Sequence, residues 1–285
     1  MTDPSGRMLD EVEASSRESI RCAAVVHGGA GPGPDRRANL EPSIARVREV
    51  LAAGGDAISA AVEGCVILED DPVFNAGTGG VMRTDGSVLT DASLHVSDGR
   101  LGFVVAMKNT PNPIRICADL LDEEINGLSG VGARLWADER GHTNAPVVGR
   151  SPKGQIGDTV GVIVRDSTGL IAAATSTGGC SYRPPGRVGD VPLPGCGFWA
   201  EGNLAVASTG IGEAITQALL SYRVHERIRA GNNLSPDALA ATMKWGINTL
   251  VAPDKQVGII ALGPEGEGAG EANTDMPWAT WCEES

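Results

Sequence analysis

The residue with the clearest potential for covalent chemistry is a threonine at the start of a predicted strand. Residues 160–164 and 170–174 are apolar, β-rich runs that flank the turn cluster 165–169, a pattern typical of a β-hairpin. Thr159 precedes the first run, and Thr177 lies at the end of the second. In an antiparallel pair the start of one strand lies beside the end of the other, so we expect the two hydroxyls to meet at one rim of the sheet.

A threonine hydroxyl is a weak nucleophile, and it needs a base in order to attack a carbonyl group. No histidine lies near Thr159 in the sequence. A free α-amine on Thr159 itself could be the base, because an α-amine has a pKa of about 8 and is partly neutral near pH 7. This chemistry requires cleavage between Asp158 and Thr159. The cut would also account for residues 138–158, which are polar and lack a periodic pattern.

Two further pairs of residues could complete a site, although each also has a structural interpretation. Arg187 can bind a carboxylate through its fork of N–H groups, and Asp190 can accept from an ammonium group, so together they suit the α-carbon of an amino acid. A surface ion pair within the loop is the alternative. Thr209 and Gly210 could form an oxyanion hole from a hydroxyl and a backbone N–H, or Thr209 could simply cap a helix.

The composition narrows the classes of partner and compartment. The formal net charge of −13 argues against nucleic acid or an anionic membrane as a partner, because both require a basic face. No apolar run approaches the roughly 20 residues of a membrane span, and residues 1–20 lack the apolar core of a secretory signal. The six cysteines have no paired short spacing, so we expect free thiols, a cytoplasmic protein and no Cys-x-x-Cys metal site.

The rest of the chain must supply the elements that position these residues. The order of apolar runs and turn signals predicts antiparallel sheets covered by helices, in layers. The glycine-rich loop at 27–33 could cradle a phosphate, but no Gly-Lys-Ser/Thr follows it, and close backbone packing is the preferred interpretation. Outside the central hairpin we expect strands at 22–26, 101–107, 204–208 and 257–262, a hairpin at 80–89, and helices at 42–53, 56–68, 112–124, 213–228 and 236–251.

Six short motifs occur in order along the chain and together resemble a known family. They are HGGAG (27–31), FNAGTG (74–79), GDTVG (157–161), ATSTGG (174–179), PGRVGD (185–190) and STGIGE (208–213). The combination is similar to the plant-type L-asparaginase and isoaspartyl peptidase family of N-terminal nucleophile (Ntn) hydrolases. The resemblance implies an α+β fold, a four-layer αββα sandwich of antiparallel sheets covered by helices, made as an inactive precursor that cuts itself by autoproteolysis.

The resemblance also implies how the chain is divided and which residues catalyse the reaction. It suggests one structural domain with an extension at 1–20, an α-subunit at 21–158 and a β-subunit at 159–285, assembled as a homodimer of cleaved protomers, (αβ)2. The bond between Asp158 and Thr159 would be the cleavage site, and Thr159 the nucleophile, with its new amine as the base. Thr177 would hydrogen-bond to Thr159, while Thr209 and Gly210 would form the oxyanion hole.

Binding roles follow from the same resemblance. Arg187 and Asp190 would hold the α-carboxylate and α-amine of the substrate, with Gly212 assisting and Asn75 near the pocket. The implied reaction requires no cofactor. A sodium-binding loop, built mainly from carbonyl groups, would comprise Leu68, Glu69, Asp71, Phe74, Ala76 and Thr78, and oxygen ligands suit such a hard cation.

The implied activity is that of a threonine amidohydrolase that cleaves β-aspartyl amide bonds in small molecules, namely isoaspartyl dipeptides, L-asparagine or both. Alternatives stay open: an amidase for glycosyl-asparagine or a specialised metabolite, an uncleaved homologue that only binds a ligand, or a nucleotide-binding protein. Segments 180–184, 253–258 and 272–276 depart from the family pattern. These are segments where specificity would be set, so the resemblance leaves the exact substrate open.

Overall fold

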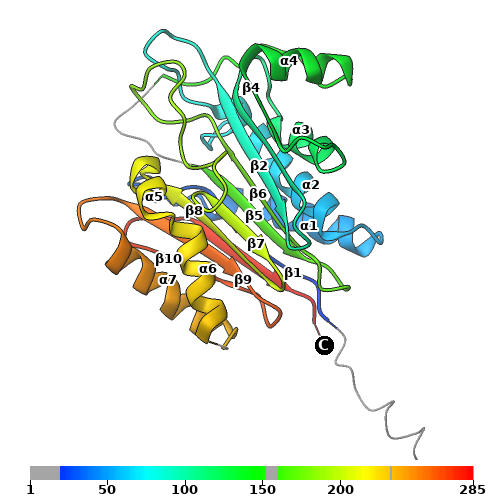
Figure 1. The fold of residues 1–285 in the computed structure, drawn as a ribbon, viewed down its shortest axis with the longest axis vertical. Coiled ribbons are helices and arrows are strands. Elements are labelled where there is room, and N and C mark those ends of the chain that lie inside the picture. The colour runs from blue at the N-terminus through cyan, green and yellow to red at the C-terminus, as the bar shows by residue number, and fades with distance from the viewer. Residues whose placement is uncertain (1–19, 152–158, 232, 285) are drawn as a thin grey trace, which may run out of the picture.

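Two β-sheets lie face to face in the computed structural model, and helices cover the outer face of each (Figure 1). The structure describes residues 20–151, 159–231 and 233–284. The larger sheet contains, in spatial order, β11 (Trp278–Cys282), β1 (Ala23–His27), β5 (Val160–Arg165), β6 (Ile171–Thr177), β2 (Thr90–Val96), β3 (Leu101–Met107) and β4 (Gly127–Ser129). The smaller sheet contains β10 (Ala269–Ala272), β9 (Val257–Leu262), β8 (Leu204–Gly210) and β7 (Phe198–Glu201). Paired strands are antiparallel, except that β4 runs parallel to β3.

The helices form the two outer layers. The larger sheet is accompanied by α1 (Glu41–Ala52), α2 (Ala57–Asp70), α3 (Pro113–Leu120) and α4 (Gly130–Glu139). The smaller sheet is covered by α5 (Gly212–Ala218), α6 (Leu220–Gly231) and α7 (Pro236–Leu250). Short 3-10 turns occur at Arg37–Asn39 and Gly77–Gly79. The predicted αββα sandwich is therefore confirmed, with the parallel β3–β4 pair as an addition to its antiparallel sheets.

Each sheet is buried on both faces, which explains why the sequences of its central strands are continuously apolar. In β1, Ala24 and Val26 belong to the core beneath the helices, whereas Ala23 and Val25 belong to the core between the sheets. The core between the sheets contains many alanines, and these small side chains allow the two sheets to approach each other.

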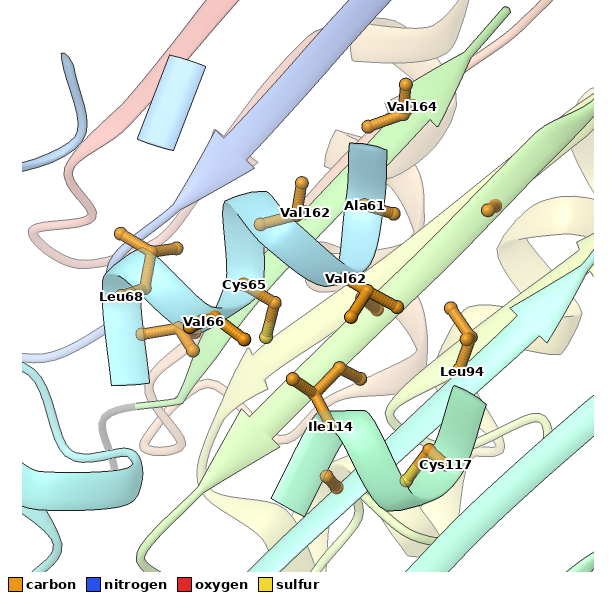
Figure 2. Close-up of a cluster of buried hydrophobic side chains, with 14 of the residues drawn as sticks. Ala61, Val62, Cys65, Val66, Leu68, Leu94, Ile114, Cys117, Val162 and Val164 are labelled. Carbon is orange, nitrogen blue, oxygen red and sulfur yellow. The ribbon is translucent and has the colours of Figure 1, made fainter. Parts of the chain in front are cut away.

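Two helices close the core on the outer side of the larger sheet (Figure 2). Val62 and Cys65 of α2 and Cys117 of α3 lie over the strands, where they belong to the same buried cluster as Leu94 and Val162. Asp56 fixes the start of α2, because its carboxylate accepts a hydrogen bond from the Ser59 N–H (2.8 Å), as predicted for an N-cap.

The predicted hairpin at 80–89 is wrong. A turn does form there, since the Gly86 N–H donates to the Arg83 carbonyl (3.0 Å) and the Arg83 N–H donates to the Ser87 carbonyl (2.8 Å). The preceding residues have a distant partner instead, because Val81 forms an isolated bridge with Arg150. The local turn signal was real, but long-range backbone pairing determined where the flanking residues go.

Other differences concern the ends and the weakest elements. The predicted helix at 213–228 is divided at Leu219, which adopts a left-handed conformation with a φ of 47°. Helix α3 ends at Leu120 rather than at residue 124, and Asn112 does not cap it, because its amide donates to Asp70 (2.9 Å). Helix α4 and strands β2, β4, β7, β10 and β11 were not predicted.

Within the described part of the chain, no helix is both long enough and apolar enough to cross a membrane.

A buried arginine ties the far end of β5 to two other segments. Arg165 is 1% exposed, and its Nε donates to the Arg21 carbonyl (2.8 Å). Its Nη2 donates to the Gly266 carbonyl (3.0 Å), and its Nη1 donates to the Gly263 carbonyl. Hydrogen bonds from a charged donor are among the stronger ones in proteins. Arg165 therefore joins β5 to the residues before β1 and to the loop after β9.

Candidate active site

Three of the predicted threonines are on the strand faces that look into the space between the sheets. In β5, Val162 belongs to the core beneath the helices, whereas Ile163 belongs to the core between the sheets. Because side chains alternate along a strand, Thr159 is on the same face as Ile163. The same alternation places Thr177 of β6 and Thr209 of β8 on the inter-sheet faces of their strands. All three are at least 96% buried, with exposed fractions of 4%, 3% and 0%.

The central hairpin forms as predicted and sets the first two threonines side by side. Strands β5 and β6 pair with Val160 opposite Ser176. One step further along this register, Thr159 lies beside Thr177. The Thr177 Oγ1 also accepts a hydrogen bond from the Gly179 N–H (3.0 Å), which orients the turn that follows β6.

Thr209 is at the same end of the sandwich. Its cross-strand partner Gly258 is so close to Ala30 that a methyl group on the glycine would lie 3.2 Å from the Ala30 Cβ. Ala30 follows β1, whose last residue His27 pairs with Gly161 at the start of β5. The structure therefore gathers the three threonines at one rim.

A histidine lies beside Thr159 in space, which corrects the expectation drawn from the sequence. His27 is completely buried, and its ring lies against Gly161. Its Nδ1 accepts a hydrogen bond from the Gly29 N–H (3.2 Å). Burial lowers the pKa of His27 to about 3, although a contact with the Thr159 backbone opposes this shift. Such an imidazole is neutral and a poor base, so a separate base for Thr159 is still required.

Asn75 shapes the turn after Thr177 rather than presenting a free amide. It is completely buried, and its Oδ1 accepts from the Val81 N–H (2.9 Å). Its Nδ2 donates to the Gly179 carbonyl, and its own carbonyl accepts from the Gly178 N–H (2.9 Å). In this geometry the Asn75 side chain positions the rim of the site through backbone contacts.

Arg187 and Asp190 meet over Gly212, at the first residue of α5. A methyl group on Gly212 would lie 2.7 Å from both the Arg187 Nη2 and the Asp190 Oδ1, so a larger residue there would displace these side chains. Glu213 binds the Arg187 Nε (3.2 Å) and Nη2 (3.0 Å). Burial alone lowers the pKa of Arg187, but these hydrogen bonds and the nearby charges of Glu213 and Asp190 together raise it above its ordinary value.

Asp190 is buried deeply enough to change its ionisation. It is 4% exposed, and its Oδ2 has no hydrogen-bond partner among the described residues. Burial raises the pKa of Asp190 to about 7, and the nearby Arg187 only partly offsets this effect. The carboxyl group is therefore poised to ionise close to neutral pH.

Thr209 and Gly210 have the local geometry of a binding position rather than of a helix cap. The N-cap of α5 is Ile211, so Thr209 does not cap the helix. Within residues 20–151, 159–231 and 233–284, the buried Thr209 Oγ1 has no hydrogen-bond partner. Gly210 has a φ of 123°, and a methyl group there would overlap the Gln256 carbonyl.

A buried charge pair completes the same rim. Asp91 is the cross-strand partner of Thr177, and the Arg83 Nη2 lies 3.9 Å from the Asp91 Oδ2. Both side chains are fully buried. Burial raises the pKa of Asp91 to about 6, although a hydrogen bond from the Ala106 N–H and the charge of Arg83 oppose the shift.

In the segment predicted as a sodium loop, two glycines pack closely against backbone carbonyl groups. A methyl group on Gly77 would lie 2.6 Å from the Glu69 carbonyl oxygen, and one on Gly79 would overlap the Phe74 carbonyl oxygen. The Asp71 and Ala76 carbonyls accept hydrogen bonds within the loop. Carbonyl oxygens around two glycines are a donor set that suits a hard cation.

A separate group of possible metal ligands lies where β7 meets α6. Single ligand atoms of Glu201, His225 and Glu226 fall within 4.8 Å of one another. Glu226 is paired with Arg229 (2.7 Å), and the His225 Nε2 contacts the Glu201 carbonyl (3.3 Å), so contacts within the protein account for this group.

The sequence analysis missed four residues that the fold brings to the rim. Two of them could have been found from the motifs, because Glu213 ends STGIGE and His27 begins HGGAG. Arg83 and Asp91 could not, because neither belongs to a recognised motif. Asp158, the predicted residue before the cut, lies outside the described residues.

The sequence is similar to those of several known proteins. The sequence profile of a family described as "Asparaginase" matches residues 20–151 and 140–285. The chain is 34% identical to an "Isoaspartyl peptidase/L-asparaginase" from Synechocystis sp., over 85% of this chain and 82% of that protein. It is 33% identical to a "Plant-type L-asparaginase" from Pyrobaculum calidifontis, over 90% and 95% respectively. It is also 36% identical to an "Isoaspartyl peptidase/L-asparaginase" from Bos taurus, over 90% and 91%.

The buried Glu69 gives a testable dependence of stability on pH. Burial raises the pKa of Glu69 from 4.5 to about 8, although a hydrogen bond from the Ile114 N–H opposes the shift. Between these values the unfolded chain has lost the proton and the folded chain keeps it, so rising pH lowers the free energy of unfolding. Glu69→Gln removes this loss, and we expect a higher melting temperature than wild type at pH 8.5 and a similar one at pH 4.5.

Glu63 on the same helix is the matched control. Arg115 and Arg46 hold the pKa of Glu63 below its ordinary value, despite some burial. Glu63→Gln should therefore lower the melting temperature at pH 8.5, where the carboxylate is ionised. A Glu69→Gln variant that melted below wild type at pH 8.5 would contradict the assignment of a protonated Glu69.

Proposed function

Because the chain belongs to the asparaginase family, we propose that it is a hydrolase that cleaves β-aspartyl amide bonds, in isoaspartyl dipeptides, L-asparagine or both. The observation that carries this proposal is the gathering of Thr159, Thr177 and Thr209 at one rim between the sheets. The names of the relatives from Synechocystis and Bos taurus support the substrate class.

The enzyme matures by cutting its own chain between Asp158 and Thr159. The products are an α-subunit, residues 21–158 with the extension 1–20, and a β-subunit, residues 159–285, which remain one structural domain. Support comes from the position of Thr159 just before β5, a strand that is paired on both sides. A cut at this point frees the α-amine and leaves the threonine anchored.

The free α-amine of Thr159 then supplies the base, a role for which the neutral His27 is unsuited. The Thr159 Oγ attacks the side-chain amide carbon, and its proton passes to the α-amine. The Thr209 hydroxyl and the Gly210 N–H stabilise the oxyanion, while Thr177 orients the nucleophile. The C–N bond breaks, the amine or ammonia leaves with a proton, and water hydrolyses the β-aspartyl ester to restore Thr159. The unpartnered hydroxyl of Thr209 supports its role.

Arg187 and Asp190 hold the α-carboxylate and α-ammonium groups of the substrate, over Gly212. Glu213 occupies the Nε and one N–H of Nη2 of Arg187. The remaining N–H groups of Nη1 and Nη2 form an end-on fork for a carboxylate. Asp190 accepts from the ammonium group, and a bound cation favours the ionised form of this carboxyl.

The cytoplasm is the compartment that we propose, because the six cysteines are free thiols in the structure. Fractionation of cells that express the protein tests this assignment, and recovery outside the cytoplasm would overturn it.

Maturation is tested by the intact mass of freshly purified protein under denaturing conditions. We expect two fragments from the wild type, the second beginning at Thr159, and a single full-length species from Thr159→Ala. The variant should also lose at least about 10³-fold in kcat/KM for isoaspartyl dipeptides, because the nucleophile is absent. An intact chain that still hydrolysed these substrates would exclude the free-amine mechanism. Turnover of glycosyl-asparagine alone would exclude isoaspartyl dipeptides and L-asparagine as the substrates.

A sodium ion bound by the loop of Leu68, Glu69, Asp71, Phe74, Ala76 and Thr78 should stabilise the protein. At a free concentration of ten times its dissociation constant, such an ion adds about 1.4 kcal/mol to the free energy of unfolding. We expect a lower melting temperature in choline chloride than in sodium chloride at equal ionic strength. Equal melting temperatures in the two salts would argue against an ion-binding loop.

A homodimer of cleaved protomers is the assembly that we propose. Val131 and Leu135, one turn apart on α4, are 78% and 59% exposed and give this helix an apolar outer face. Sedimentation equilibrium should give about 59 kDa, twice the 29.3 kDa of one chain. Leu135→Asp should weaken the dimer, whereas Arg223→Asp, at an exposed position on α6, should not. A wild-type protein that sediments as 29 kDa at micromolar concentration would refute the dimer.

A further inference from the structure

Arg83 is a buried guanidinium with unused hydrogen-bond donors. Its side chain has no exposed surface, yet its Nε and Nη1 have no hydrogen-bond partner among the described residues. Its Nη2 makes only a long contact with the Leu89 carbonyl (3.5 Å). Buried donors of this kind are costly to leave unpaired. Arg165, which is equally buried, has three carbonyl partners, so the condition of Arg83 is not a general property of buried arginines in this chain.

The guanidinium is part of the rim that carries the threonines. It lies against Gly179, where a methyl group would be 2.5 Å from its Cζ and its Nη1. Gly179 donates to the Thr177 Oγ1 (3.0 Å), so Arg83 is separated from that hydroxyl by one turn of chain. Its nearest anion, Asp91, is the cross-strand partner of Thr177.

Asp91 balances the charge of Arg83 without satisfying its donors. The Asp91 Oδ2 lies 3.9 Å from the Arg83 Nη2, which is too far for a hydrogen bond. The Asp91 Oδ1 accepts from the Ala106 N–H (2.7 Å) instead. Within the described part of the chain, the N–H groups on Nε and Nη1 therefore have no acceptor.

The two arginines at this rim, Arg187 and Arg83, differ in whether a carboxylate of the protein already accepts hydrogen bonds from them. Glu213 already accepts hydrogen bonds from one side of Arg187. Arg187 lies beside Asp190, so the pair suits a ligand group that carries both a carboxylate and an ammonium. Arg83 has no comparable internal anion in hydrogen-bond contact within the described residues. A fork of guanidinium N–H groups matches a carboxylate better than it matches a neutral acceptor.

We propose that Arg83 is a second carboxylate-binding residue of the substrate pocket, and that it recognises the C-terminal carboxylate of an isoaspartyl dipeptide. This inference rests on the proposed function and deepens it. A β-aspartyl dipeptide carries two carboxylates, one on its aspartyl α-carbon and one on its leaving group. L-Asparagine carries only the first. Arg83 therefore makes the enzyme prefer dipeptides with a free C-terminus over asparagine and over dipeptides with an amidated C-terminus.

The test compares three substrates with wild type and Arg83→Met: isoaspartyl-leucine, isoaspartyl-leucine amide and L-asparagine. For the variant, kcat/KM for isoaspartyl-leucine should fall about 10- to 100-fold, the loss expected for a charge-assisted hydrogen bond. The values for the amide and for asparagine should change less than about 3-fold. Arg83→Lys keeps the charge but lacks the fork, so it should recover only part of the lost activity.

Two controls separate recognition from folding. Intact mass and melting temperature establish that each variant is processed and folded. Arg100→Met removes an arginine in the turn between β2 and β3, at the opposite end of β2. Arg100 is 41% exposed and pairs with Asp98, so this variant should leave all three substrates unaffected. An equal fall for the three substrates with Arg83→Met, or no fall at all, would overturn the proposal.

Failure of the proposed function can be recognised separately. If wild type hydrolyses none of the three substrates, the β-aspartyl activity is wrong, whatever Arg83 does. Calorimetric titration of the wild type and of Arg83→Met with isoaspartyl-leucine and its amide then still tests the residue. A selective 10- to 100-fold weakening for the free acid supports recognition of a carboxylate, and equal weakening or none overturns it.

Discussion

The backbone register of β5 is the constraint on which the site depends. The strand is paired with β1 on one side and β6 on the other, so the position and direction of Thr159 are set by hydrogen-bonded neighbours on both sides. A slip of one residue would send Thr159 toward the helices and Val160 toward the inter-sheet space, because side chains alternate with a period of two. The valines at 160, 162 and 164, all buried beneath the helices, oppose such a slip. Ordinary apolar packing thereby holds the proposed nucleophile, the Thr159 hydroxyl, in place.

Buried charge distinguishes this rim from the rest of the core. Burial makes ionisation harder for Asp91 and Asp190 and lowers the pKa of Arg83. Placing such groups out of water costs free energy unless each finds a partner. At the far end of β5, Arg165 finds three carbonyls, and the structure there is complete by itself. At the rim, the unused atoms of Arg83, Asp190 and Thr209 are what a charged, hydrogen-bonding small molecule would satisfy.

Much of the fold was predictable because strong local signals agreed with the tertiary structure. The central hairpin, β9, α7 and the Asp56 cap followed from apolar periodicity and cap residues. The hairpin at 80–89 failed because a turn at Asp85–Gly86 does not fix where its flanks pair. Strand β10 was missed because its residues, Ala-Gly-Glu-Ala, have no strand preference and pair only through their backbone with β9.

The site was only partly visible in the sequence for a related reason. Thr159 and Thr177 are joined by a short turn, so local reading sufficed to place them together. His27 and Arg83 reach the rim by contacts with residues far along the chain, Gly161 and Gly179. No local pattern records such contacts. Their burial, which sets their ionisation, depends on the whole sandwich, and so a sequence motif cannot report it.

The place of β1 has a consequence for how the protein is made. This strand lies between β5 and β11, and Cys22, the residue just before it, donates to the carboxylate of Glu283, which is 261 positions away. The larger sheet can close only after the ribosome has released the residues of β11. Thr159 acquires its surroundings at that point, so the self-cleavage that we propose has to follow the folding of the larger sheet. In the proposed cleaved form, each fragment holds strands that lie between strands of the other, so the two fragments separate only on unfolding. A denatured pair of fragments must find each other by diffusion, whereas an uncut precursor refolds as a single molecule.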